Sequence, residues 1–151
     1  MTTIRLATEG DIPRILELYR QLAITTSQAE LCNSPSLDDC RRVFAEIGIF
    51  PGHELLVAEE EGKVIGTLVL LIVPNLSHSA LPWALVENIV VDEKHRRQGI
   101  GRLLMNYAIA RAKEAGCYRI VLSSDKRRKE AHKFYRSLGF QASAHGFRLY
   151  F

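Results

Sequence analysis

The sequence predicts an α/β fold, of the mixed-sheet (α+β) type, in a single domain that spans residues 1–151. Three observations lead to this prediction. Short runs of strand-forming residues recur along the chain, stretches with apolar residues at helical spacing separate them, and one such stretch joins two central strands as a crossover. With 47% hydrophobic and 25% charged residues, the chain can bury a core and present a charged surface.

The first expected elements are a strand and a helix. Thr3–Ala7 has the composition of a short strand. Thr8 and Asp11, followed by Pro13, have the spacing of a helix start, because capping side chains and a first-turn proline suit the unpaired N–H groups there. The helix carries one apolar face, formed by Ile12, Ile15, Leu16, Tyr19, Leu22 and Ala23.

A polar segment at Thr25–Ser34 then leads to a second helix. Ser36 and Asp39 predict its start and Gly48 its end. Residues 54–73 indicate two strands joined by a Glu-Gly turn, since both halves are rich in aliphatic residues and the turn residues favour a hairpin.

The remaining chain alternates strands and helices. We expect a loop at 74–82, a strand at 83–92, a helix from Ile100 to just before Gly116, a strand at 117–124, a helix stopped at Gly139, and two closing strands within 140–151. The helix at Ile100 is the crossover between the strands on either side of it.

Composition argues against several classes of function. The net charge of +3 is too small by itself to indicate a nucleic-acid-binding protein. Three cysteines and five histidines show no metal-ligand spacing, so we expect no metal site, no disulfide framework and a cytoplasmic location. No apolar leader opens the chain, and its longest apolar run, Val64–Val73, is too short to span a bilayer.

One stretch, residues 96–102, has the composition of an anion site. It places Gly99, Gly101 and three arginines between an apolar strand and a helix start. A helix N-terminus carries unpaired N–H groups and the positive end of the helix dipole, and glycine lets a ligand approach the backbone. These features predict a phosphate-bearing ligand. A nucleoside triphosphate loop would need Gly-Lys-Ser/Thr and a dinucleotide fingerprint a glycine at Leu104, so both match poorly.

The pattern from Arg96 to Gly101 instead resembles the R/Q-x-x-G-x-G/A signature of the GCN5-related N-acetyltransferase (GNAT) superfamily. Val86–Leu104 and Ala131–Phe140 carry the strongest similarity. The resemblance implies a GNAT fold of about seven strands and about four helices, in which the fourth and fifth strands splay apart. It also implies transfer of the acetyl group from acetyl-CoA to a primary amine of a small molecule by direct attack.

The same resemblance assigns the cofactor contacts. The turn would bind the diphosphate of acetyl-CoA, and the strand before it would pair with the pantetheine arm and polarise the thioester carbonyl. The implied cofactor-binding residues are Ile89, Val90, Val91, Arg96, Arg97, Gln98, Gly99, Ile100, Gly101, Arg102, Ser124, Arg128 and His132. Arg128 stands where many members have Asn, and the alternative for Arg128 and His132 is a solvated surface.

Two catalytic roles also follow from the resemblance. Glu87 lies between Val86 and Asn88 in an apolar strand, where burial would favour a carboxyl group that takes a proton from the amine. The alternative is that Glu87 anchors the substrate cation. Tyr135 matches the family tyrosine that protonates the departing CoA thiolate, and the alternative is a tyrosine of the core.

Other functions remain open on the sequence alone. A catalytically silent acyl-CoA-binding regulatory module and an acetyltransferase of protein or peptide amino groups would use the same turn. The segments "VENIVVD" and "GCYRIVL" resemble glucosamine-phosphate acetyltransferases. A nucleic-acid-binding domain with basic patches at 94–97 and 126–129 is disfavoured by the small net charge. The apolar end "FRLYF" predicts a homodimer, and we expect neither nucleic acid nor membrane as a partner.

Overall fold

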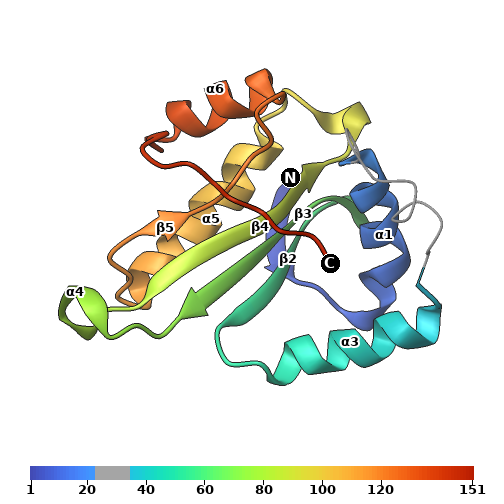
Figure 1. The fold of residues 1–151 in the computed structure, drawn as a ribbon. Helices are drawn as coiled ribbons and strands as arrows, with labels where there is room; N and C mark the ends of the chain where they lie inside the picture. The colour runs from blue at the N-terminus through green and yellow to red at the C-terminus, as the bar shows by residue number, and fades with distance from the viewer. Residues whose placement is uncertain (23–34) are drawn as a thin grey trace. The chain divides into compact units, whose positions relative to one another are not determined.

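The computed structural model describes residues 1–22 and 35–151, which form two compact units. The first unit is Met1–Val121 and the second is Leu122–Phe151, and each is described by itself. The first contains a mixed sheet with helices, so the predicted α/β class is confirmed (Figure 1). The predicted polar segment Thr25–Ser34, and Ala23 of the predicted apolar face, lie outside the described residues.

The sheet of the first unit has five strands in the order β1-β2-β3-β4-β5. They are β1 Thr2–Leu6, β2 His53–Glu60, β3 Lys63–Val73, β4 Trp83–Val91 and β5 Ile120–Val121. Neighbours are antiparallel except β4 and β5, which are parallel and joined by a helical crossover as predicted. The β2–β3 hairpin turns at Glu61 and Gly62, both with positive φ, which is the geometry that tight hairpins need.

The described helices of the first unit begin where the sequence predicts them, apart from a short helix at 77–80. They are α1 Ile12–Gln21, α3 Leu37–Ile49, the short α4 Ser77–Ala80 and α5 Ile100–Glu114, with single 3-10 turns η1 at Glu9–Asp11 and η2 at Glu93–His95. The Thr8 N–H donates to the Asp11 carboxylate at 2.7 Å, and the Asp39 N–H donates to the Ser36 hydroxyl at 3.1 Å. The second bond caps α3, and the first caps η1, which leads directly into α1, so both predicted helix starts are confirmed.

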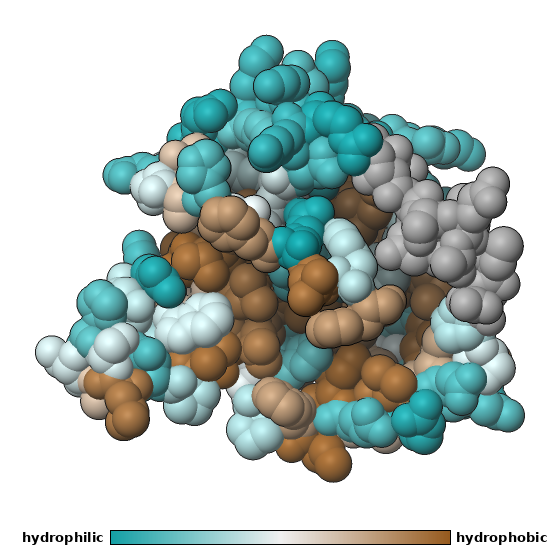
Figure 2. All heavy atoms as spheres, in the orientation of Figure 1, coloured by the Kyte–Doolittle hydropathy of each residue, from teal (hydrophilic) through white to brown (hydrophobic). Residues whose placement is uncertain are grey.

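Both faces of the sheet are covered by helices (Figure 1). On one face, α1 packs in a cluster of buried apolar side chains that consists of Ile15, Leu18, Leu55, Val57, Val64 and Val90, and α3 adds Phe44 and Ile47 at its edge. On the other face α5 lies so close that a Cβ on Gly66 would be 3.1 Å from Leu104 Cδ1. Val43 and Ile49 of α3 and the following Phe50 are exposed. The lower part of Figure 2 shows hydrophilic and hydrophobic residues mixed on this surface.

Three predictions about elements are corrected by the structure. The loop at 74–82 contains α4, in which His78 and Ser79 have left-handed backbone angles. The strand predicted at 117–124 is limited to Ile120–Val121, since β4 and β5 pair at only two positions. The two closing strands are absent from the described structure of 140–151, because a strand needs a hydrogen-bonded partner and the second unit offers none. The second unit contains α6, Lys129–Ser137, which ends before Gly139 as predicted.

Two glycines with the same backbone angle provide a test of the packing at the start of β2. Gly52 has a φ of 81°, and an added Cβ would lie 2.7 Å from the Ile72 carbonyl oxygen. Gly62 has a φ of 77°, but its Cβ would meet nothing within 4 Å. We expect Gly52→Ala to lower the free energy of unfolding by about 2 kcal/mol more than Gly62→Ala, because only the first clashes with a fixed backbone atom. Equal losses in denaturant unfolding would contradict this packing.

Candidate functional site

Strand β4 is interrupted by a bulge in its middle. Its register with β3 shifts between the pairs Val69–Glu87 and Thr67–Val90, and Asn88 has a φ of 51°. A bulge of this kind bends a strand and re-aims its side chains. On its other side β4 pairs with β5 only at Ala84 and Leu85. The described structure therefore contains no strand paired with β4 on that side beyond Leu85, which is the splay that the sequence predicts.

The bulge corrects the predicted burial of Glu87. The usual alternation of inward and outward residues fails here, and both Glu87 and Asn88 are exposed. The side chain of Asn88 forms a hydrogen bond with Tyr19 of α1, whose pKa is raised by burial and lowered in part by that bond. Glu87 is thus an accessible carboxylate, and its neighbour Asn88 is held by the hydrogen bond to Tyr19 of α1.

The chain leaves β4 through η2 and enters α5 through a turn at residues 96–99. Arg97 and Gly99 have φ values of 63° and 81°, and Gly99 is the residue that caps α5. No side chain caps this helix, so its first N–H groups have no partner from a capping residue. A Cβ added to Gly99 would meet nothing within 4 Å, so the space beside Gly99 is open. The turn can therefore receive an anion.

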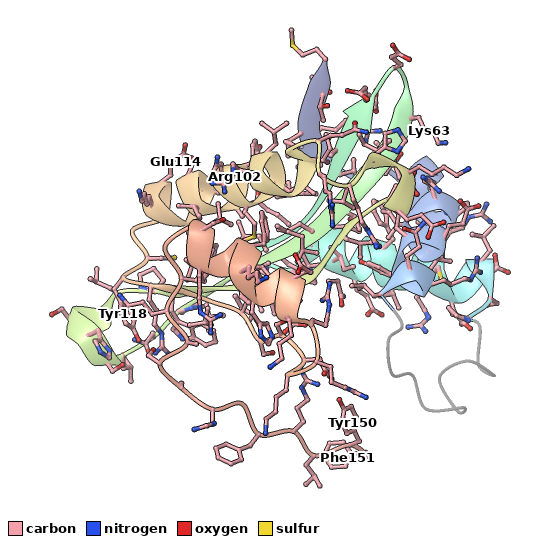
Figure 3. The ribbon with its side chains drawn as sticks, turned by 90° about the horizontal axis from the view of Figure 1, so that it is seen from above. Lys63, Arg102, Glu114, Tyr118, Tyr150 and Phe151 are labelled. Carbon is pink, nitrogen blue, oxygen red and sulfur yellow. The ribbon has the colours of Figure 1, made fainter. Side chains whose placement is uncertain are left out.

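The residues predicted to bind the cofactor in β4 and at the turn differ in exposure. Arg96, Arg97, Gln98, Gly99 and Arg102 are exposed, and Figure 3 shows Arg102 on α5 pointing away from the sheet. The side chains of Val90 and Ile100 are instead buried at 4% exposure. These two residues can offer a ligand only their main-chain groups.

A buried carboxylate that the sequence analysis did not single out lies at the end of β4. Asp92 is 3% exposed and is bonded to Arg14, Gln21 and His95. Burial alone would raise the pKa of Asp92, but the bonds from Gln21 and His95 and the charge of Arg14 outweigh it and hold this pKa at about 2. An acidic residue directly after an apolar strand is the signal that could have revealed it, since a buried charge requires partners.

The second unit contains the other predicted cofactor contacts. The Ser124 hydroxyl oxygen is buried and has no hydrogen-bond partner among the described residues. His132 Nε2 donates to the Asp125 carbonyl oxygen at 2.8 Å, so one ring nitrogen is already engaged. Arg127, which forms a 2.9 Å ion pair with Asp125, lowers the pKa of that carboxyl group. Arg128 is half-buried at the start of α6.

Tyr135 lies on α6 and is 7% exposed. Its ring contacts those of Phe134 and Phe140, with centroids 5.4 Å and 6.1 Å away. Burial raises the pKa of Tyr135 above its ordinary value, while the charge of Arg128 acts in the opposite direction. No described residue of 122–151 is hydrogen-bonded to its hydroxyl, although buried tyrosine hydroxyls usually have a partner. The phenol is therefore protonated at neutral pH and available to a ligand.

Comparison with known proteins decides the family. The family model described as the acetyltransferase (GNAT) family matches residues 15–140, which include the bulged strand, the turn and α6. This chain belongs to the GNAT acetyltransferase family. The resemblance seen in Val86–Leu104 and Ala131–Phe140 is thereby confirmed, and the protein is an acyltransferase enzyme.

Relatives of this GNAT acetyltransferase share nearly its whole length. A glucosamine 6-phosphate N-acetyltransferase of Trypanosoma brucei brucei is 29% identical, over 97% of this chain and 93% of the relative. An L-amino acid N-acyltransferase of Escherichia coli K12 is 27% identical, over 94% of this chain and 81% of the relative. The crystal structure of glucosamine-6-phosphate N-acetyltransferase from Arabidopsis thaliana has a TM-score of 0.86 and 25% identity, covering 100% of this chain and 99% of that one.

Two further properties concern metals and membranes. Among residues 1–22 and 35–151, no group of three or more His, Cys, Asp or Glu side chains is placed to hold a metal ion. Within the same residues, no helix has the length and apolar character needed to cross a membrane.

Proposed function

We propose that this GNAT enzyme transfers the acetyl group of acetyl-CoA to the primary amine of a small molecule. The observation that carries the proposal is the uncapped N-terminus of α5, which follows a bulged strand within the region matched by the family. The relatives' names supply the acceptor class. Glucosamine 6-phosphate and L-amino acids are both small amines that also carry an anionic group, so we propose an acceptor of that kind.

The proposed cofactor contacts divide between main chain and side chains. The N–H groups at residues 97–102 would bind the diphosphate, with the Arg96 and Arg97 side chains adding charge. The main chain of Ile89–Val91, which has no strand on its β5 side in the described structure, would pair with the pantetheine arm. Ser124, Arg128 and His132 of the second unit complete the proposed set. The unpartnered hydroxyl of Ser124 supports its place in it.

The proposed chemistry requires two proton transfers. An amine with a pKa of about 10 is mostly an ammonium ion at neutral pH, so it must lose a proton before it attacks the thioester. We assign that step to the exposed carboxylate of Glu87, acting directly or through water. The tetrahedral intermediate then collapses, the C–S bond breaks, and Tyr135 protonates the departing thiolate.

The proposal is tested by a turnover screen that follows the release of free CoA thiol. The purified full chain is mixed with acetyl-CoA and with glucosamine 6-phosphate, glucosamine, L-amino acids, polyamines or peptides. We expect turnover with at least one small amine that carries phosphate or carboxylate. Turnover with peptides alone would identify a protein acetyltransferase instead. Tight acetyl-CoA binding without any turnover would favour a silent regulatory module.

Glu87→Gln distinguishes a base from a substrate anchor. If Glu87 takes the proton of the amine, we expect kcat to fall about 10²-fold at neutral pH, with little change in the KM for the amine. The matched control is Glu93→Gln, which changes an exposed carboxylate of η2 in the same unit. An unchanged kcat with a raised KM for the amine would show that Glu87 anchors the substrate cation.

Oligomeric state and location are further parts of the proposal. Phe147, Leu149, Tyr150 and Phe151 are exposed large apolar side chains near the end of the chain, and such residues favour an interface, so we propose a homodimer. Size-exclusion chromatography with light scattering tests the proposed homodimer.

The location of the enzyme is a separate part of the proposal. The free thiols of Cys40 and Cys117 support a reducing compartment, and we propose the cytoplasm.

A further inference from the structure

Asp92 is the only charged residue that is buried in the part of the chain that the structure describes. It lies between the last residue of β4 and the first residue of η2, directly before the turn at 96–99. Its own N–H donates to the Ile65 carbonyl oxygen at 2.8 Å, which fixes its backbone to β3. A buried charge is unfavourable unless it is paired and hydrogen-bonded, so its partners indicate what it does.

The partners of Asp92 come from two elements, α1 and η2. Arg14 and Gln21, which lie about two turns apart on α1, bring Nη2 and Nε2 to 3.2 Å and 3.1 Å from its carboxylate. His95 of η2 brings Nδ1 to 2.8 Å. Because an ionised carboxylate only accepts hydrogen bonds, His95 Nδ1 is the donor. Three donors from two elements thus converge on one buried group.

Gln21 makes a second link between α1 and η2. Its amide nitrogen donates to Asp92, while its amide oxygen accepts the Glu93 N–H at 2.9 Å. Arg14 is fixed in turn by a 2.9 Å bond from Nε to the Val64 carbonyl oxygen. Residues 92–95, which lead into the turn, are therefore connected to α1 and to β3 by hydrogen bonds, and the side chains that form these bonds are fixed by further contacts.

The turn needs such support from outside. Arg97 has a left-handed backbone, which a residue with a side chain adopts only when its surroundings impose it. Within η2 the main chain contributes the bond from the His95 N–H to the Asp92 carbonyl oxygen. The Arg96 side chain folds back so that Nε reaches the Val91 carbonyl oxygen at 3.2 Å. The first of these contacts ends on Asp92 itself, and the second ends on Val91, the residue directly before it.

We propose that Asp92 is a positioning residue that sets the turn at 96–99 for the diphosphate of acetyl-CoA by fastening it to α1. The inference rests on the proposed function and goes beyond it, because it assigns the shape of the cofactor turn to a residue that does not touch the ligand. Removing the hydrogen bonds between Asp92 and α1 should weaken the binding of acetyl-CoA and leave the rate of the chemical step nearly unchanged.

The first test is Asp92→Asn in the full chain. We expect the Kd of CoA from calorimetry, and the KM for acetyl-CoA, to rise about tenfold, while kcat stays within about twofold. The matched control is Asp11→Asn. The Asp11 carboxylate is also largely buried and receives 2.7 Å bonds from Arg5 and from the Thr8 N–H, but it ties β1 to the start of α1. This control should lower the melting temperature without changing CoA affinity.

A second variant keeps the inference testable if Asp92→Asn does not fold. Gln21→Met removes both hydrogen bonds of the bridge but leaves the carboxylate in place, and we expect a weaker effect on CoA affinity in the same direction. Wild-type CoA affinity in either folded variant, or equal weakening in Asp11→Asn, would overturn the inference. If the wild-type chain neither binds acetyl-CoA nor releases CoA, the proposed function itself is wrong. That outcome is distinguishable from failure of the inference because it is measured on the wild type alone.

Discussion

Tyr135→Phe should lose about 10³-fold in kcat for acetyl transfer while it binds acetyl-CoA as tightly as the wild type. The substitution removes one hydroxyl group and leaves the ring, so its contacts with Phe134 and Phe140 are retained. The hydroxyl has no partner in residues 122–151, so its loss leaves no buried group unpaired there. Steady-state kinetics together with CoA calorimetry measure both quantities.

The pH profile of this variant gives an independent check. Burial raises the pKa of Tyr135 above its ordinary value, so the acid stays protonated through the neutral range and loses its proton only in alkaline solution. The ratio of wild-type to variant kcat should therefore be constant at neutral pH and fall at the alkaline end. Tyr107→Phe, on the half-buried side of α5, is the matched control and should retain full activity. A Tyr135→Phe enzyme with unchanged kcat at every pH would refute the assignment.

Gly99→Asp should raise the Kd of acetyl-CoA about 100-fold. The carboxylate would stand in front of the uncapped N-terminus of α5, where it would repel the diphosphate and compete for the same N–H groups. Strain is a smaller part of the effect, because Asp tolerates a positive φ better than most residues and its Cβ would enter open space. We therefore expect a folded protein with a normal melting temperature, measured beside the Kd.

Gly99→Asn separates the charge from the shape of the new side chain. Asn has nearly the same size and tolerates the left-handed region equally well, but it is neutral. The difference in CoA affinity between the two variants reports the charge and should shrink as salt is added. If Gly99→Asp binds acetyl-CoA as the wild type does, the diphosphate does not lie at this turn.

Local signals in the sequence predicted the elements well. Helix starts marked by Thr8 with Asp11 and by Ser36 with Asp39 are confirmed, because capping bonds involve residues close in the chain. The Glu-Gly turn of the β2–β3 hairpin is confirmed for the same reason. The turn before α5 was predicted from its composition, because glycines and arginines at a helix start are typical of an anion-binding site.

Features that depend on distant residues could not be predicted. The family resemblance implies a bulge in this strand, but the residue types do not show that the bulge falls at Asn88 and exposes Glu87. The partners of Asp92 on α1 lie far from it in the sequence, so only the fold brings them together. Strands at 140–151 were predicted from apolar residues alone, but a strand also requires a neighbour that the second unit does not supply.

The splay of β4 from β5 leaves the backbone hydrogen-bonding groups of β4 beyond Leu85 without a partner strand in the described structure. A cosubstrate arm that lies along β4 would pair with these groups, so it would act as a missing strand as well as a reactant. By mass action, occupancy then adds to the stability of the native state. The concentration of acetyl-CoA would in this way affect the stability of the enzyme as well as its rate.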